Sequence, residues 1–168
     1  ESESSIFSIK DYLLFIAFFP RLLAGPIYYY GEYKDKLQKS LTQPISWDDI
    51  GRGMSIFCLG LFKKVVCADR LSIIVDSFYI NPEGFSTVDT WFATLAYSLQ
   101  IYFDFSAYSE MALGIGMMFG VILPLNFNSP YKATSIIDFW SRWHMTLSRF
   151  IKEYVYIPLG GNQTNQTR

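Results

Sequence analysis

Long apolar stretches, separated by short polar ones, dominate the chain. The first covers residues 11–30, which is long enough to cross a bilayer as a helix of about 20 residues. Pro20-Arg21 and Gly25-Pro26 interrupt it. A proline frees a carbonyl inside an apolar helix, and an arginine at mid-span is costly unless it faces a partner or a water-filled cavity. We therefore predict a broken segment rather than a plain membrane anchor.

Residues 31–49 are a polar connection that leads into a helix start. Ser46 stands three residues before Asp49, the spacing at which a serine side chain caps a helix, and Trp47 suits a membrane interface.

The second apolar stretch, residues 54–79, carries Lys63 and Lys64 near its middle. Two arrangements are open: one long helix that leaves the membrane at Lys63, or two helices that meet near Asp69. The Asn-Pro and Glu-Gly pairs within residues 80–85 predict a loop.

The stretch from 90 to 131 is the most membrane-like, because Asp104 and Glu110 are its only formally charged residues. We predict one membrane span over 90–105 and a second, glycine-rich helix over 108–124, with both acids between them. The small residues of the second helix permit close packing: Gly114, Gly116 and Gly120.

The two acids have two interpretations. They form a carboxylate pair, although a six-residue offset separates them around an α-helix unless the segment breaks, or they mark a membrane boundary. Asp104 and Tyr108 are spaced to hydrogen-bond within one helix.

Prolines and asparagines predict a loop over 123–131, after which residues 135–157 fit one amphipathic helix. Such a helix lies along the membrane surface or closes over the bundle. Asp138–Arg142 and Arg149–Glu153 are oppositely charged pairs four residues apart. The apolar positions recur at spacings of three and four: Ile136, Trp140, Trp143, Leu147, Phe150, Ile151 and Tyr154.

Composition supports a membrane protein. Hydrophobic residues make up 51% and charged residues 17% of the chain, against about 25% charged in soluble domains. We therefore expect an all-α, polytopic membrane helical bundle with an amphipathic helix near its C-terminal end. A net charge of −1 gives no electrostatic basis for binding nucleic acid. Cys58 and Cys67 have no metal-ligand spacing, so we expect buried thiols and no metal site.

His144 is the single histidine of the chain and stands between Trp143 and Met145. One interpretation is a packed histidine that is hydrogen-bonded to a neighbouring helix. The other is functional, because an ionisable group in an apolar setting is a functional hypothesis by default. Desolvation would lower its pKa and keep the imidazole neutral near pH 7, as a proton acceptor requires.

Five stretches, taken in order, resemble one family. They are FFPRLLAGPI (18–27), GLFKKVVCADRL (60–71), LQIYFDFSAYSEMALGIGMMFG (99–120), LPLNFNSPY (123–131) and DFWSRWHMTLSRFIKEYVYIPLGGN (138–162). They are similar to the bacterial branch of the membrane-bound O-acyltransferases (MBOAT), close to the membrane component of alginate O-acetylation. The resemblance extends from about residue 15 to residue 162.

The resemblance implies an acyltransferase, moving acetyl groups to hydroxyls of a cell-surface polysaccharide. It implies a multi-pass protein of the bacterial cytoplasmic membrane in contact with lipid, with no bound cofactor. The acyl donor would be acetyl-CoA or an acyl carrier, and the acceptor the polysaccharide or a periplasmic acyl-accepting partner protein. D-alanyl transfer to teichoic acid by the same family, and a non-enzymatic transport or scaffold module, are the alternatives.

The resemblance also implies site residues. His144 is a supporting polar residue, and the principal histidine, in a Trp-His-Gly context, is expected beyond Arg168. Residues 1–168 would then be a partial MBOAT domain, truncated at both ends and inactive alone. The passage for donor and acceptor is expected to involve Trp140, Trp143, Asp104, Tyr108, Asp138 and Arg142.

Overall fold

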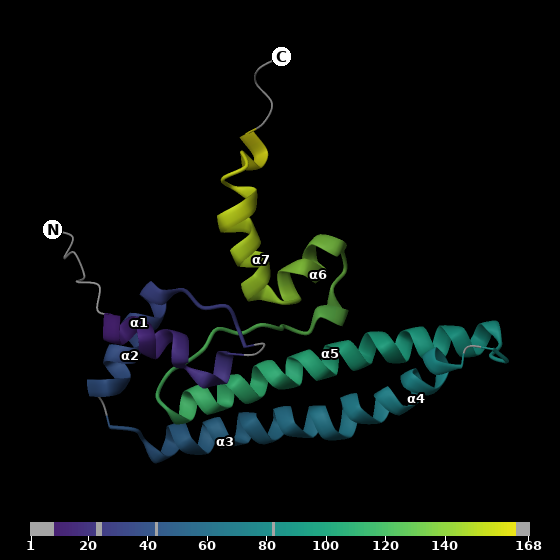
Figure 1. The fold of residues 1–168 in the computed structure, drawn as a ribbon, viewed down its shortest axis with the longest axis horizontal. Helices are drawn as coiled ribbons and strands as arrows, with labels where there is room; N and C mark the ends of the chain where they lie inside the picture. The colour runs from purple at the N-terminus through teal and green to yellow at the C-terminus, as the bar shows by residue number, and fades with distance from the viewer. Residues whose placement is uncertain (1–8, 23–24, 43, 82, 164–168) are drawn as a thin grey trace.

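The computed structural model describes residues 9–22, 25–42, 44–81 and 83–163, and all regular structure in these ranges is helical (Figure 1). The expected all-α class is thereby confirmed. The helices are α1 (Ile9–Ala17), η1 (Phe19–Arg21), α2 (Tyr30–Thr42), α3 (Trp47–Phe62), η2 (Lys63–Ala68), α4 (Asp69–Ile80), α5 (Thr87–Met118), η3 (Pro130–Lys132), α6 (Ile136–Arg142), α7 (Met145–Ile151), η4 (Lys152–Tyr156) and η5 (Gly161–Gln163).

A long helical hairpin organises the molecule. The chain runs out along α3, η2 and α4, turns, and returns along α5, so that α3 and α5 lie side by side (Figure 1). The turn falls in the predicted loop 80–85, of which Pro82 lies outside the described residues. The helices touch at their glycines, since a Cβ added to Gly114 would stand 2.5 Å from the carbonyl oxygen of Gly53. Close packing predicted at Gly114 is confirmed.

The prediction of two helices between residues 90 and 124 was wrong, because α5 is one helix of 32 residues. Its acids do not mark a break. Asp104 is 2.6 Å from Lys64 Nζ, and Glu110 pairs with Lys63, both lysines belonging to η2 across the hairpin. The two acids suggested a membrane boundary, but ion pairs across the hairpin allow α5 to carry both of them without a break.

The lysines lie in a π-helical segment that joins α3 to α4. Residues 54–79 are helical throughout: α3 ends at Phe62, η2 follows, and α4 begins at Asp69, so the winding changes at the predicted junction although the helical backbone is not interrupted. Cys58 is exposed and Cys67 half-buried, so the expectation of buried thiols was wrong.

The first apolar stretch is broken as predicted, although residues 23–24 within it lie outside the described ranges. α1 ends at Ala17, and the Arg21 guanidinium donates to the carbonyl oxygen of Phe15 from Nε at 3.1 Å and Nη2 at 2.7 Å. The arginine thus takes up a carbonyl at the end of α1.

The polar connection predicted over 31–49 contains a helix, because residues 31–42 belong to α2. α2 has 13 residues and a polar composition. Its helix is held against the rest of the protein by Tyr33, whose side chain is buried in the core. The cap predicted at Ser46 is confirmed, because Ser46 Oγ accepts a hydrogen bond from the backbone N–H of Asp49 at 3.0 Å.

A loop returns from the end of α5 and positions the rest of the chain. The turn begins at Gly120, whose φ of 73° is a left-handed conformation suited to glycine. Residues 121–129 then run back over α5 towards α6 (Figure 1), in agreement with the loop predicted over 123–131. Val121 and Leu123 are buried with Tyr28, Tyr33 and Ala112.

None of the helices in the described ranges combines the length and the apolar character needed to cross a membrane.

Candidate functional site

The helix predicted over 135–157 is interrupted at His144, so the prediction of one continuous helix was wrong. α6 ends at Arg142, α7 begins at Met145, and His144 has φ 42° and ψ 54°. The reason lies in the loop: Asn128 N–H donates to the carbonyl oxygen of Arg142 at 2.9 Å, and Met145 N–H donates to that of Asn126 at 2.9 Å. These bonds replace those that a continuous helix would make internally.

Asn126 is the centre of the polar contacts at this break. The residue is 2% exposed, and its Oδ1 accepts hydrogen bonds from Thr146 Oγ1 at 2.9 Å and from Thr146 N–H at 3.4 Å. His144 Nδ1 lies 2.9 Å from the same oxygen. The amide nitrogen donates to Ser109 Oγ at 3.2 Å, and the N–H of Ile27 donates to Thr146 Oγ1 at 3.1 Å. One buried amide thus connects α5, the loop and α7, and Thr146 extends the network to the segment before α2.

The imidazole of His144 is packed among uncharged groups. Phe105 meets it edge to face with ring centroids 4.8 Å apart, and Phe127 lies 6.4 Å away. Burial lowers the pKa of His144 below its ordinary value. The imidazole is therefore neutral at pH 7, as a proton acceptor must be.

The two tryptophans beside the break have different surroundings. Trp143 stacks on Phe139 with ring centroids 5.6 Å apart and meets Phe127 edge to face at 5.1 Å. Trp143 is therefore part of an aromatic cluster that supports the histidine. Trp140 is instead 53% exposed and lines an open cavity of about 750 Å³, with Thr146 and Arg149 also in its wall. Aromatic and polar groups around such a hollow are typical of ligand sites.

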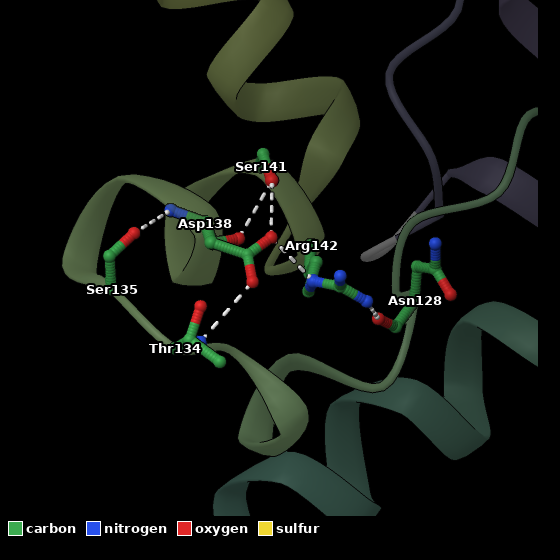
Figure 2. Close-up of polar contacts among 6 residues, drawn as sticks. All are labelled: Asn128, Thr134, Ser135, Asp138, Ser141 and Arg142. Atoms are coloured by element: carbon green, nitrogen blue, oxygen red, sulfur yellow. Dashed lines mark hydrogen bonds and ion pairs between the residues drawn. The ribbon is translucent and has the colours of Figure 1, made fainter.

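Asp138 and Arg142 hold α6 and the loop together (Figure 2). Arg142 Nε donates to Asp138 Oδ1 at 2.7 Å, and Arg142 Nη1 reaches the carbonyl oxygen of Asn128 at 3.4 Å. The other carboxylate oxygen accepts from the N–H of Thr134 at 3.3 Å, while Ser135 Oγ caps the helix by accepting from Asp138 N–H at 3.1 Å. The hydrogen bond from Arg142 holds the pKa of Asp138 below its ordinary value.

Both ion pairs predicted from their four-residue spacing are present, Asp138–Arg142 and Arg149–Glu153. In the second pair, Arg149 Nε lies 3.1 Å from Glu153 Oε1. Asp104 is directed to Lys64 and not to Tyr108, the partner expected within α5. Tyr108 is half-buried. Phe105, and not Asp104, is the α5 residue that contacts the His144 ring.

Sequence patterns did not identify Asn126, Ser109 or Thr146. The signal available was the asparagine pair in the proline-bounded stretch 123–131, since asparagine side chains in loops commonly bond backbone groups. Within the described residues, no three side chains of the metal-binding kinds gather at one place.

A model of the membrane-bound O-acyltransferase family (MBOAT) matches residues 1–167. The peptidoglycan O-acetyltransferase of Helicobacter pylori is 49% identical over 166 residues, which are 97% of this chain and 32% of that protein. The probable alginate O-acetylase AlgI of Pseudomonas aeruginosa is 42% identical over 158 residues, 93% of this chain and 29% of the relative. The teichoic acid D-alanyltransferase of Bacillus subtilis is 31% identical over 149 residues, 86% of this chain and 37% of the relative. The chain thus spans about a third of the length of these relatives.

Proposed function

Because the chain belongs to the membrane-bound O-acyltransferase family, we propose that the full-length protein transfers acetyl groups to hydroxyls of a cell-envelope polysaccharide. The 49% identity to a peptidoglycan O-acetyltransferase supports acetyl as the group that is moved. The observation that carries the proposal is the neutral imidazole of His144, held by the buried Asn126. His144 directly precedes Met145 and Thr146, which line the same cavity as Trp140.

The chemistry is an ester-forming transfer. The acceptor hydroxyl oxygen attacks the acetyl carbonyl carbon of a thioester donor, and a base takes the hydroxyl proton. The C–S bond then breaks and releases the donor thiolate, which is protonated to the thiol. Hydrogen-bond donors stabilise the charge that develops on the carbonyl oxygen. By the family resemblance, the principal base is a histidine in a Trp-His-Gly context outside these 168 residues, and His144 assists as a second polar group. Trp140, Trp143, Asp138 and Arg142 shape and position this site, and Asp104 and Tyr108 border the passage from α5.

The location and the partners follow from the same proposal. The protein acts as a multi-pass protein of the bacterial cytoplasmic membrane, with acetyl-CoA or an acyl carrier as donor. Its acceptor is the polysaccharide itself or a periplasmic partner protein that receives the acyl group first.

The test is complementation of a deletion strain with the full-length gene. Wild type is expected to restore base-labile acetate on the cell-envelope polymer. His144→Ala is expected to restore at least about tenfold less at equal protein level, because it removes a proton-accepting group. Lys39→Ala, on the exposed side of α2, is the matched control and should behave as wild type.

Two results would contradict the proposal. Unchanged polymer acetylation in His144→Ala would remove His144 from the site. Loss of ester-linked D-alanine, with acetate unaffected in the deletion strain, would replace acetyl transfer by D-alanyl transfer, the activity in the name of the Bacillus subtilis relative.

A further inference from the structure

The orientation of the Asn126 amide follows from its neighbours. The backbone nitrogen of Thr146 is only a donor, so the amide atom 3.4 Å from it is the oxygen. The hydroxyl of Thr146 accepts from the N–H of Ile27 at 3.1 Å, which leaves its own proton for the same oxygen at 2.9 Å. Ser109 Oγ takes the amide N–H at 3.2 Å on the other side. The oxygen is therefore the atom that faces His144.

This orientation determines which ring nitrogen of His144 carries the proton. A neutral imidazole has one N–H and one lone pair, and the bond made by one nitrogen decides the state of the other. Asn126 Oδ1 accepts only, and it lies 2.9 Å from His144 Nδ1. A lone pair on Nδ1 would face the lone pairs of the oxygen, so Nδ1 carries the proton.

We propose that Asn126 is a positioning residue for the transfer reaction, which holds His144 in the Nδ1–H tautomer and leaves the Nε2 lone pair as the proton or hydrogen-bond acceptor. The role rests on the proposed function, although the tautomer itself does not. Within the described part of the chain Nε2 makes no hydrogen bond, so it is available for an acceptor hydroxyl.

The backbone supports the same geometry. Asn126 receives the first N–H of α7 with its carbonyl and the second with its side chain, so it also acts as the helix cap that His144 itself does not supply. The left-handed backbone of His144 is unfavourable for a residue that is not glycine. Such a conformation persists because its surroundings determine it. Here Asn126 bonds the two N–H groups that follow His144, and the N–H of Asn128 bonds the carbonyl oxygen of Arg142 before it.

The direct test is ¹⁵N NMR of the histidine side chains in the full-length protein in lipid nanodiscs, with a His144→Gln sample to identify the signals of His144. The wild type is expected to show a protonated Nδ1 and an unprotonated Nε2 at pH 8. Asn126→Leu removes the acceptor at similar volume, and the Nε2–H form should then appear. Ser109→Ala removes the partner of the amide nitrogen alone and should leave the Nδ1–H form in place.

The conservative variant Asn126→Asp separates positioning from stability. A carboxylate still accepts from Nδ1–H, so the tautomer should be retained, and the added negative charge should move the titration of His144 to higher pH. In acetyl transfer, Asn126→Leu is expected to lower kcat by about 100-fold with little change in KM. Asn126→Asp should recover most of kcat with its pH profile displaced upwards.

An Nε2–H tautomer in the wild type, or an Nδ1–H tautomer unchanged in Asn126→Leu, would overturn the proposal. If Asn126→Leu does not fold, the wild-type tautomer and the titration of Asn126→Asp still decide it. An Nδ1–H tautomer in a protein that transfers no acetyl would instead overturn the proposed function and leave the geometry intact.

Discussion

His144 combines a strained backbone with an uncharged setting, and both follow from its neighbours. Asn126 Oδ1 holds the ring at Nδ1, while Phe105 and Phe127 pack against the ring. None of these three groups carries a charge that would compensate an imidazolium ion. Protonation of His144 is therefore opposed in the folded protein by desolvation alone.

A pH dependence of stability follows at the residue scale. Burial lowers the pKa of His144 in the folded protein below 6.5, so the unfolded chain binds the proton more readily. Stability is then lost as the pH falls through 6.5 and on towards the lower folded pKa, and the histidine has no such effect above about pH 7.5. Wild type should therefore lose thermal stability relative to His144→Asn between pH 7.5 and 5.0.

The comparison uses His144→Asn because asparagine tolerates the left-handed backbone and does not titrate. Unfolding temperatures of both full-length proteins are measured across the pH range in the same detergent, so that other titrating groups cancel. Parallel curves would show that His144 is as well solvated as in the unfolded chain.

At the scale of elements, the α3–α5 contact depends on the absence of side chains. A Cβ on Gly114 would lie 2.5 Å from the oxygen of Gly53 and 2.7 Å from the nitrogen of Phe57. A Cβ on Gly60 would lie 2.8 Å from the oxygen of Ala107. These atoms are backbone, which cannot rotate away, so any side chain there must separate the helices.

Gly114→Ala is accordingly expected to destabilise the protein by about 1–3 kcal/mol through overpacking. The matched control is Gly51→Ala in α3, where an added Cβ meets nothing within 4 Å. That substitution should stabilise by about 0.5–1 kcal/mol, because alanine favours the helix over glycine. Thermal unfolding of the two variants measures the contrast. Equal effects at both positions would disprove the close approach at Gly114.

At the scale of the whole molecule, large apolar side chains remain uncovered along the hairpin. At the start of α5, Trp91 is 66% exposed and Phe92 is 67% exposed. Exposed apolar area of this extent marks a surface for membrane or protein contact. If the protein is membrane-bound as proposed, we expect this part of α5 to lie against lipid.

A probe attached at position 91 tests this location. In a full-length variant whose native cysteines are replaced by alanine, Trp91→Cys carries a fluorophore that brominated lipid should quench. Lys39→Cys on the polar helix α2 is the control and should be quenched much less. Equal quenching at the two positions would count against lipid contact at Trp91.

The sequence patterns correctly predicted features that depend on residues close together in the chain. The break at Pro20-Arg21, the cap at Ser46 and the loop over 123–131 depend on residues close in sequence, and all three are present. The unbroken α5 and the interruption at His144 were missed for the opposite reason. Asp104 is accommodated by Lys64, 40 residues earlier, and His144 by Asn126, 18 residues earlier. Periodicity within one segment does not contain such partners.

The π-helical turn η2 has a consequence for insertions and deletions. A wide turn holds about one residue more than an α-helical turn, and each residue turns an α-helix by about 100°. Deleting a single residue between Lys63 and Ala68 would therefore restore regular α-helical winding and leave α4 close to its present rotation about the helix axis. Asp69, now 2.8 Å from Lys64, would move from five to four residues after that lysine and stay on the same side of the helix. The π-helical segment therefore holds one additional residue without changing which side of α4 faces α5.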